Sequence, residues 1–466
     1  MLQAVGPARV RIAIVGAGVA GAFSAYFLRE RLGLAAEITV LEREPRVGGR
    51  VAELGIAGTR IETGATLIHT ANRHMVGAVE RLGLHAASGS RRSGVPARRL
   101  AIWNGASFDL HVAGGTLALA LRALWRYGAS LLRARRLTVD MVRKLDSIYG
   151  EQAQGASFET PEAMFRRLGL YELTQVDADT YFRRHGVSLR FVREFSDGVA
   201  RANYNQATGM NAFVTLVSLA GGGLGGGRLV SVAEGNVRVV EGLLSASRAR
   251  VRTGVEVRRV AAERASGTGY RVVTADGGED VFDVVIVAAP LEFAALEVSG
   301  VDLPAAAHVR RTYCVTHTTI VAGRLRPAFF GIPERDDPSP YLVLTRNHPA
   351  IPFSALGWIG RAADGRQDVY KLFSRDTLDD ELLDRLFSWR TETVRLAWRA
   401  YPMLEPTSVW PPFRLSHGLY YVNAMESAVS TMETEAIAAC NVANLAASEL
   451  AQAGLAPAVG GGPRVA

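Results

Sequence analysis

The sequence has very few cysteines, which excludes two kinds of stabilised small fold. Only Cys314 and Cys440 occur among the 466 residues, with no Cys-x-x-Cys pair and no histidine at metal-ligand spacing. A disulfide framework needs several cysteine pairs, and a structural zinc site needs clustered cysteine or histidine ligands. We therefore expect two reduced thiols and no bound metal.

Lysine is also nearly absent from the chain. Lys144 and Lys371 are the only two, so 51 of the 53 basic residues (53 − 2) are arginine, and the 45 acidic residues leave a net charge of +8. The arginines are scattered instead of being clustered with aromatic residues, which argues against nucleic-acid binding. With 48% hydrophobic and 21% charged residues, the composition is that of an ordinary globular protein.

Long uninterrupted apolar runs are missing as well. Residues 12–28 carry no charge, but Gly16, Gly18 and Gly21 interrupt them. The segment is shorter than the about 20 apolar residues that a membrane span needs. No basic region followed by a small-residue cleavage site is present. We therefore expect neither a membrane helix nor an export signal, and a cytoplasmic protein.

The same uncharged segment is better explained as the start of a dinucleotide-binding fold. Residues 10–15 are apolar and β-branched, as in a buried parallel strand. A G-x-G-x-x-G sequence follows. Gly16 permits a tight turn, Gly18 lets the backbone approach a pyrophosphate, and Gly21 lets the next helix pack against the strand. The pyrophosphate would lie on free N–H groups at that helix N-terminus.

A second strand is predicted at residues 37–41, and an acidic residue ends it. Glu42 lies about 20 residues after the glycines, where an acid accepts hydrogen bonds from a ribose diol. Gly48, Gly49 and Arg50 then form a Gly-Gly-Arg sequence, and this segment resembles flavoproteins of the amine oxidase and desaturase group. Two glycines let the backbone pass beneath a cofactor, and an arginine can offer paired donors to phosphate. FAD is therefore favoured over NAD.

Further elements of an FAD-binding domain occur much later in the chain. Strands are predicted at residues 255–260, 270–274 and 282–290, the last ending in small residues that would let an adenine group approach closely. Residues 419–423 have the pattern of a final strand. The S-x-x-E sequence at residues 430–433 predicts a capping box before a long helix, whose positive end would favour negative charge on a flavin ring.

These segments predict an α/β fold in which a Rossmann-type FAD-binding domain is interleaved with a mixed α+β substrate domain, as in the amine oxidases. We assign residues 1–85, 221–299 and 409–453 to the FAD-binding domain, 86–220 (mainly helical) and 300–408 to the substrate domain, and 454–466 to a flexible tail. The glycine-rich residues 221–227 are expected to be a flexible connector.

Residues 117–145 combine helical apolar spacing with a basic opposite face, formed by Arg122, Arg126, Arg133, Arg135 and Arg136. Two explanations remain open. The segment is either a core-facing helix pair with a solvated basic face, or a helix at a membrane surface that delivers a lipophilic substrate.

Segments outside the FAD-binding elements resemble the prenylcysteine oxidases, also called prenylcysteine lyases. They are LWRYG at 124–128, RANYNQ at 201–206, NAFV at 211–214, VYKLFS at 369–374, LYYVNAMESA at 419–428 and METEAIAACN at 432–441. The resemblance extends from residue 9 to about residue 450, and the last two segments are the most specific. It implies an FAD-dependent oxidase of lipophilic thioethers.

The chemistry implied by this resemblance is oxidative cleavage of S-farnesyl- or S-geranylgeranyl-L-cysteine. A hydride would leave the allylic carbon beside sulfur for flavin N5, water would add, and the hemithioacetal would collapse to a prenyl aldehyde and cysteine. O2 would then reoxidise the flavin and form H2O2. FAD, bound non-covalently, would perform the difficult step while protein groups position and desolvate the substrate.

The resemblance also implies candidate site residues. Lys371 would assist oxygen reduction if burial lowers its pKa, His69 at the end of the flavin-lining stretch 61–69 would contact substrate or relay a proton, and Tyr204 would frame the site. The candidate FAD contacts are Gly16, Ala17, Gly18, Val19, Ala20, Gly21, Glu42, Arg43, Gly49, Arg50, Thr66, Leu67, Val257, Ala289, Asn423, Ala424, Thr431 and Met432. Arg201 is a candidate for binding a substrate carboxylate.

Two other functions remain open from the sequence, because chemistry depends on the site and not on the fold. One is an FAD-dependent amine oxidase or isoprenoid desaturase with the same architecture. The other is a protein that binds FAD without turnover. The expected partners are a lipophilic small molecule and O2, with peripheral membrane contact and oligomeric state left open.

Overall fold

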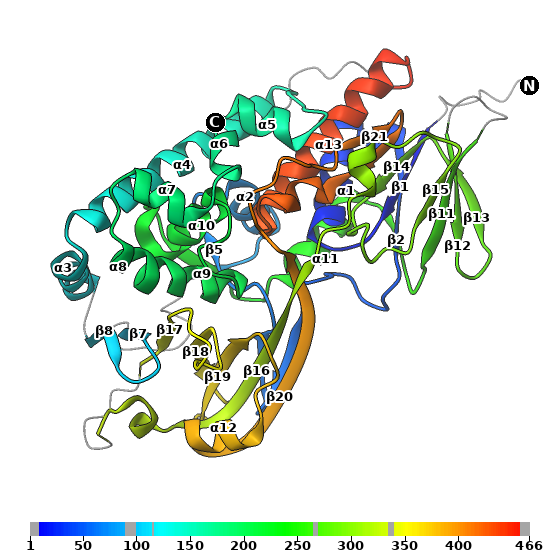
Figure 1. The fold of residues 1–466 in the computed structure, drawn as a ribbon. Coiled ribbons are helices and arrows are strands. Elements are labelled where there is room, and N and C mark those ends of the chain that lie inside the picture. The colour runs from blue at the N-terminus through cyan, green and yellow to red at the C-terminus, as the bar shows by residue number, and fades with distance from the viewer. Residues whose placement is uncertain (1–8, 89–98, 114–115, 264–268, 334–339, 457–466) are drawn as a thin grey trace, which may run out of the picture.

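The fold has two interleaved halves, each built on a β-sheet (Figure 1). The computed structural model describes residues 9–88, 99–113, 116–263, 269–333 and 340–456. The tail predicted at 454–466 lies outside these ranges from residue 457 onward. We call the half that contains the first strand the nucleotide half, and the half built on the larger sheet the substrate half.

The nucleotide half is centred on a six-stranded sheet in the order β10–β2–β1–β14–β22–β21. All of its pairings are parallel except that of β21 with β22. The strands are β10 (Arg250–Thr253), β2 (Ala36–Glu42), β1 (Val10–Val15), β14 (Val284–Val287), β22 (Leu419–Tyr421) and β21 (Arg414–Ser416).

Both faces of this sheet are covered, which explains why β1 is apolar throughout except at the half-buried Arg11. In Figure 1, helices α1 (Val19–Leu32), α11 (Val237–Ser247) and α13 (Met432–Gln452) lie on one side of the sheet. A four-stranded sheet lies on the other side, in the order β13–β12–β11–β15. Its strands are β13 (Glu279–Phe282), β12 (Tyr270–Thr274), β11 (Val257–Ala262) and β15 (Glu297–Ser299).

Two predicted strands are shorter in the structure than in the sequence pattern. The strand expected at 282–290 is β14, which ends at Val287, because the chain turns at Ala288, whose N–H still bonds to Val15 O (2.8 Å). The strand expected at 419–423 ends at Tyr421, and a 3-10 helix over Val422–Ser427 follows. In both places, apolar residues continue past the strand because the following turn is also buried.

The capping box predicted at 430–433 is displaced by one residue. Thr431 is the N-cap of α13, and its side chain exchanges hydrogen bonds with the backbone and side chain of Thr434. Glu433 instead turns towards α2 (Arg73–Arg81), where it accepts the N–H groups of His74 and Met75 at 2.8 Å each. The free N–H groups at the N-terminus of α2 therefore bind the Glu433 carboxylate, which the sequence spacing had assigned to the start of α13.

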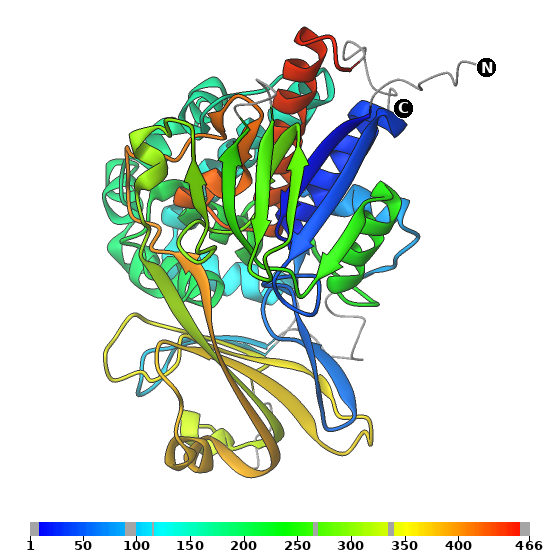
Figure 2. The same ribbon diagram turned by 90° about the vertical axis from the view of Figure 1, so that its right-hand side faces the viewer.

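The substrate half is centred on a seven-stranded sheet in the order β20–β16–β19–β18–β17–β7–β8. Its strands are β20 (Phe387–Pro402), β16 (Tyr313–Leu325), β19 (Asp368–Ser374), β18 (Ala355–Arg361), β17 (Leu342–Thr345), β7 (Arg99–Trp103) and β8 (Phe108–Ala113). Strands β7 and β8 come from the insertion expected to be mainly helical. Figure 2 shows the long pair β16 and β20, olive and orange, extending from the nucleotide half into this sheet.

A layer of helices lies on the α1 and α13 side of the nucleotide half, away from the four-stranded sheet, and above the seven-stranded sheet in Figure 1. These helices are α3 (Thr116–Tyr127), α4 (Ala129–Ala153), α5 (Pro161–Arg167), α6 (Tyr171–Thr174), α7 (Ala178–Arg184), α8 (Leu189–Phe191), α9 (Asp197–Tyr204) and α10 (Ala212–Leu219). Helices α3 and α4 form the predicted segment 117–145, with a break at Gly128 (φ 53°). None of the described helices combines the length and apolarity needed to cross a membrane.

Short elements connect the two halves. Strands β3 (Glu53–Ile56) and β4 (Thr59–Glu62) form a hairpin, and β5 (Ile68–His69), β9 (Leu229–Val232) and β6 (Ala86–Ser88) form a small sheet in the order β5–β9–β6. The glycine-rich residues 221–227, expected to be a flexible connector, begin inside a π-helical turn over Ala220–Leu224 that extends α10. Gly223 (φ 98°) interrupts this helical turn, and residues 225–227 lie outside it.

Candidate functional site

The first glycine segment forms a tight turn between β1 and α1. A Cβ atom on Gly21 would lie 1.9 Å from Gly16 O, and one on Gly16 (φ 110°) would lie 2.8 Å from Ala288 O. Helix α1 starts after Gly18, and no side chain of a described residue caps it. Its first turn has no acidic residue either. The helix N-terminus therefore has the free N–H groups that suit a phosphate.

The second glycine segment lies directly beside the first. Gly48 N–H donates to Ala17 O at 2.9 Å, and Gly18 and Gly48 form an isolated parallel bridge. Gly49 (φ 56°) lies so near that a Cβ atom there would be 3.3 Å from the Cα of Gly18. The two glycine segments, which are separate in the sequence, thus form one continuous surface of backbone atoms.

Glu42 stands at the end of β2 and is buried. Its carboxylate accepts the N–H of Ala17 at 2.8 Å and the N–H of Glu44 at 2.9 Å. The acid therefore holds the glycine turn and the strand end together, at the place where a ribose-binding acid is expected. The neighbouring Arg43 is exposed, and its guanidinium donates to Phe293 O at 2.8 Å.

Arg50 connects the second glycine segment to the C-terminal part of the chain. It forms a short salt bridge with the fully buried carboxylate of Glu426 and donates to Ala400 O at 2.8 Å. Tyr313 OH (2.9 Å) and Ser430 Oγ (3.0 Å) also donate to Glu426. The guanidinium predicted to bind phosphate is thus held by a carboxylate, while its side chain remains 31% exposed.

A second carboxyl group, that of Glu435 in the first turn of α13, lies beside Glu426. Burial raises the pKa of Glu435 well above its usual value, and the charge of Glu426 raises it further. Burial also acts to raise the pKa of Glu426, but Arg50 and Arg311 outweigh it and hold this pKa below its usual value. The two pKa values are therefore shifted in opposite directions, so Glu435 holds a proton more readily than Glu426 does. Asn423 Nδ2 donates to Glu435 at 3.0 Å.

Arg311 adds a second buried cation to this region. It binds Glu292 through two nitrogens, Nε at 2.7 Å and Nη2 at 3.0 Å, and both side chains are less than a tenth exposed. It also donates to Asn423 O at 2.9 Å and to Tyr421 OH at 2.5 Å. Arg311 precedes β16, so it joins the start of the substrate sheet to the turns after β14 and β22.

Lys371 is the buried cation of the substrate sheet. It lies on β19, and its Nζ donates to Glu62 O (3.1 Å), Gly64 O (3.2 Å) and Thr66 Oγ1 (3.0 Å). Burial lowers its pKa from 10.5 to about 8, although the charge of Glu62 opposes that shift. The Lys371 side chain therefore contacts residues 61–69, the stretch predicted to line a flavin. Burial there favours the neutral form of the amine.

Both ring nitrogens of His69 form hydrogen bonds with backbone groups. Nε2 lies 2.6 Å from Gly226 O and Nδ1 accepts the N–H of Ala71 at 3.1 Å. These contacts fit a neutral ring with the proton on Nε2. The histidine fastens the glycine-rich segment after α10 to β5, so its use in proton transfer, which stays a prediction, would require breaking one of these contacts.

Tyr204 and Arg201 lie on α9, above the substrate sheet. The Tyr204 ring packs edge-on against Tyr401, with centroids 5.0 Å apart, and burial raises its pKa. Arg201 is buried and donates to Thr345 Oγ1, Asn347 Oδ1 and Phe353 O at 3.1 to 3.3 Å. Since these neutral groups already occupy the Arg201 guanidinium, the structure gives it no open face for a substrate carboxylate.

The remaining candidate FAD contacts fall on the same converging segments, with one exception. Val19, Ala20, Thr66, Leu67, Ala289, Ala424, Thr431 and Met432 lie at the start of α1, before β5, after β14 and around the start of α13. Leu67 is 49% exposed, which is unusual for a large apolar side chain in this region. Val257 differs, because its side chain is part of the hydrophobic core beneath β11.

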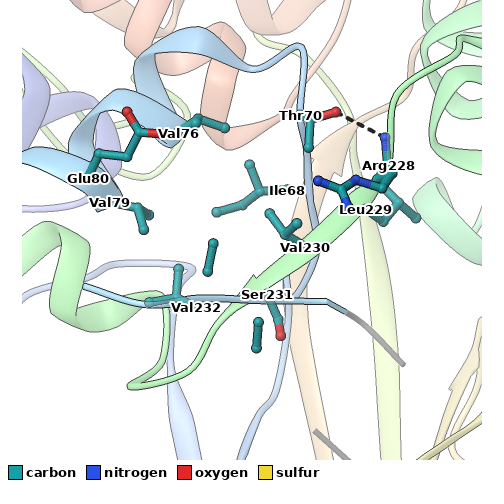
Figure 3. A pocket seen from close by; sticks show the side chains of 12 residues that line it. Ile68, Thr70, Val76, Val79, Glu80, Arg228, Leu229, Val230, Ser231 and Val232 are labelled. Atoms are coloured by element: carbon teal, nitrogen blue, oxygen red, sulfur yellow. Dashed lines mark hydrogen bonds between the residues drawn. The ribbon is translucent and has the colours of Figure 1, made fainter. Parts of the chain in front are cut away.

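The structure contains a pocket of about 590 Å³ next to β5, which was not predicted from the sequence. Figure 3 shows it between α2 and the small sheet, with Val76 and Val79 on one side and Ile68 and Val230 on the other. Arg228 lies at one end and Glu80 at the other. The lining is mainly aliphatic, and none of the three predicted catalytic residues contributes to it.

These residues fit a bound dinucleotide such as FAD. The glycines leave room for a phosphate on free N–H groups, and Glu42 stands at the end of the neighbouring strand. Asn423 Oδ1 and Ser427 Oγ are buried near the start of α13 without a hydrogen-bond partner in the described part of the chain. Buried polar atoms are normally paired, so such orphaned atoms indicate a place where a polar ligand or water supplies the partner.

Several residues of this region were not predicted from the sequence. Glu426, Glu435 and Arg311 are buried ionisable groups, and Asn236 donates to Ala65 O at 2.9 Å in the flavin-lining stretch. A signal was present for Glu426, which is the one acidic residue in the otherwise apolar or neutral stretch of residues 419–432. Acids in such a setting are rarely buried unless paired.

Comparison with known proteins agrees with this geometry. A family model described as prenylcysteine lyase matches residues 115–456, and one described as NAD(P)-binding Rossmann-like domain matches residues 14–82. Farnesylcysteine lyase of Arabidopsis thaliana is 34% identical over 93% of this chain and 87% of its own. Prenylcysteine oxidase 1 of Mus musculus is 33% identical over 94% and 88%.

The solved structure of cyclohexylamine oxidase from Brevibacterium oxydans has a TM-score of 0.64 at 15% identity, covering 95% of this chain and all of that one. At this identity the likeness concerns the fold. It confirms the expected interleaved α/β architecture, with a Rossmann-type unit and a mixed helix–sheet unit.

Proposed function

The chain belongs to the prenylcysteine lyase family, and we propose that it is an FAD-dependent oxidase that cleaves a lipophilic thioether such as S-farnesyl- or S-geranylgeranyl-L-cysteine. The family match over most of both chains carries this proposal. The paired glycine segments, Glu42 and the unpartnered polar atoms near the start of α13 support the cofactor assignment.

The overall reaction consumes one prenylcysteine, one O2 and one water, and it yields free cysteine, the prenyl aldehyde and H2O2. The carbon between sulfur and the alkene is oxidised by two electrons, its bond to sulfur breaks, and the oxygen of water becomes the aldehyde oxygen. FAD supplies the redox chemistry, taking two electrons from the substrate and passing them to O2.

The protein groups in this proposal bind, orient and adjust charge. The backbone of Gly16–Gly21 and Gly48–Gly49 holds the pyrophosphate with the N-terminus of α1, and Glu42 binds the ribose. The paired charges of Arg50 and Glu426 fix the segment between the cofactor and the substrate sheet. Lys371 is the catalytic candidate, because its buried ammonium stands on Gly64 and Thr66 and provides positive charge where oxygen is reduced.

The reaction partners in this proposal are the lipophilic thioether and O2. A prenylated amino acid partitions into lipid, so the proposal includes peripheral contact of the enzyme with a membrane surface.

A substrate panel tests the proposal against other chemistry of the same fold. Purified protein with bound flavin is mixed with prenylcysteines, with simple amines and with polyenes, and H2O2 and aldehyde are measured. We expect both products from farnesylcysteine and neither from the amines or polyenes. Peroxide from amines alone would overturn the thioether assignment and leave the fold assignment intact.

A further inference from the structure

Helix α3 presents an apolar stripe that is exposed in the described part of the chain. Leu117, Leu121, Leu124 and Trp125 are spaced along one side of the helix, and their exposed fractions are 74%, 59%, 41% and 84%. We call these four residues the α3 stripe. Large apolar side chains of soluble proteins are usually exposed singly, so a contiguous stripe of four marks an interaction surface.

The stripe belongs to a helix that is firmly attached to the fold. On the opposite side of α3, Tyr127 packs edge-on against Phe191, with centroids 5.4 Å apart, and Ala123 is buried. Arg126 binds both oxygens of Glu194, at 2.6 and 2.9 Å. Figure 1 shows α3 at the left edge of the helical layer. The exposure therefore belongs to a fixed helix at the edge of the molecule.

Exposed arginines lie on α3 and on the first part of α4. Arg122 is exposed on α3, and Arg135 and Arg136 are exposed on the adjoining part of α4. Within the described residues, no carboxylate forms a salt bridge with any of these three. The sequence contains no Asp or Glu between Asp109 and Asp140, so α3 and the first part of α4 carry charged side chains of one sign only.

We propose that the α3 stripe is a docking face for the surface of an anionic lipid bilayer. The apolar side chains would insert at the boundary of headgroups and acyl chains, and the arginines would contact the lipid phosphates and carboxylates. A tryptophan is the side chain best suited to that boundary. Delivery of a lipophilic substrate from the bilayer rests on the proposed function, whereas the docking face itself does not.

The charges favour a bilayer over a second copy of this chain. In a two-fold dimer the same patch meets itself, so Arg122, Arg135 and Arg136 would face the equivalent arginines of the other copy. Like charges at short distance are unfavourable. The acidic residues of α4, Asp140, Asp146 and Glu151, lie further along that helix and already form salt bridges with other basic residues. An anionic lipid surface is complementary both to the apolar α3 stripe and to the arginines.

Vesicle flotation with the flavin-loaded protein tests this proposal. Phosphatidylcholine vesicles are prepared with and without phosphatidylglycerol, and the bound fraction is measured for wild type, for Leu121→Gln/Trp125→Gln and for Arg135→Gln/Arg136→Gln. Trp389→Gln is the control, because Trp389 is an equally large side chain, 44% exposed, and lies on β20 of the seven-stranded sheet and not on α3.

We expect wild type and Trp389→Gln to float with the phosphatidylglycerol vesicles, and binding to weaken with added salt. Leu121→Gln/Trp125→Gln should bind at least about tenfold more weakly, since two exposed apolar side chains no longer enter the bilayer. The arginine variant should lose the preference for anionic vesicles. All variants should retain flavin and oxidise detergent-dispersed farnesylcysteine at the wild-type rate.

Equal flotation of Leu121→Gln/Trp125→Gln and wild type would overturn the proposal, as would wild type that binds neither vesicle. Light scattering adds a further outcome. A wild-type dimer that becomes monomeric in Leu121→Gln/Trp125→Gln, without vesicle binding, would make the stripe an interface between copies. Flotation needs no turnover, so failure of the thioether activity would leave its result unchanged.

Discussion

The nucleotide half and the substrate half differ in how their structure depends on sequence. In the nucleotide half, each key feature is local: a glycine follows a strand, an acid ends the next strand, and a helix starts within a few residues. Sheet neighbours come from distant segments in both halves, as the pairs β1–β14 and β7–β17 show, but the substrate half has no comparable local features. Local patterns therefore identify the cofactor surface, whereas only the assembled fold shows what lies opposite it.

The candidate catalytic group stands where the two halves meet. Lys371 belongs to the substrate sheet, but its hydrogen-bond acceptors Glu62, Gly64 and Thr66 belong to the first segment of the nucleotide half. Arg311 crosses the same boundary through its salt bridge with Glu292, and Arg50 crosses it through its hydrogen bond to Ala400 O on β20. The boundary therefore has charged contacts that each half alone would leave unpaired.

The largest effect should follow from breaking the local geometry of the nucleotide half. Gly21→Ala places a Cβ atom 1.9 Å from Gly16 O, a backbone atom that cannot move without opening the turn. We expect this variant to retain no flavin, as measured by the ratio of visible to ultraviolet absorbance. Gly150→Ala in α4 is the control, because nothing lies within 4 Å of the added atom, and it should be stabilised by about 0.5–1 kcal/mol. A Gly21→Ala protein with full flavin would contradict the account.

The next largest effect should follow from removing a cation at the boundary. Arg311→Met leaves Glu292 buried and unpaired, which should lower the free energy of unfolding by about 3–5 kcal/mol. Urea unfolding of the flavin-loaded protein measures this change. Arg166→Met removes an exposed partner of Glu162 within one helix and should change nothing measurable. Equal stabilities of the two variants would show that the boundary pair is not structural.

Lys371→Met should affect the two half-reactions, reduction of the flavin by substrate and its reoxidation by O2, to different extents. The side chain keeps its length and loses its charge, so oxygen reduction should slow by about 10²-fold, while reduction of the flavin by substrate changes little. Stopped-flow absorbance measures both rates. Lys144→Met replaces the other lysine, which pairs with Asp140 on the surface, and should alter neither rate. Equal slowing of both steps would remove Lys371 from this role.

The smallest expected effects are two pH dependences of opposite sign, one of the reoxidation rate and one of the free energy of unfolding. Because burial lowers the pKa of Lys371 from 10.5 to about 8, the ammonium is lost as the pH rises through about 8, and reoxidation should slow there. Between pH 8 and 10.5 the unfolded chain binds a proton that the folded chain does not, so the free energy of unfolding should rise with pH in that window. Both trends should be absent in Lys371→Met.

Much of the nucleotide half was predictable because its features depend on short spacings. Strand β12 was predicted with its observed ends, and the glycine turn, Glu42 and the long α13 helix were located from sequence alone. The capping box was wrong by one residue, because Glu433 is used by the N-terminus of α2. The local pattern gave no indication that an acid on one helix would bind to another.

The substrate half was less predictable because its contacts are distant in sequence. Strands β7 and β8 were placed in a mainly helical insertion, since nothing in residues 99–113 indicates a partner more than 200 residues away. Lys371 could be singled out as one of two lysines, but its pKa shift depends on burial among backbone carbonyls of another segment. The exposure of the α3 stripe likewise depends on which face of α3 the neighbouring helices cover.

Anaerobic mixing of the flavin-loaded protein with farnesylcysteine tests the central claim most directly. The visible absorption of the flavin is followed, and air is then admitted. The account predicts that the flavin bleaches, that a prenyl aldehyde and cysteine form, and that the colour returns with one equivalent of H2O2 when oxygen enters. A flavin that stays oxidised in the presence of farnesylcysteine would contradict the thioether oxidase assignment.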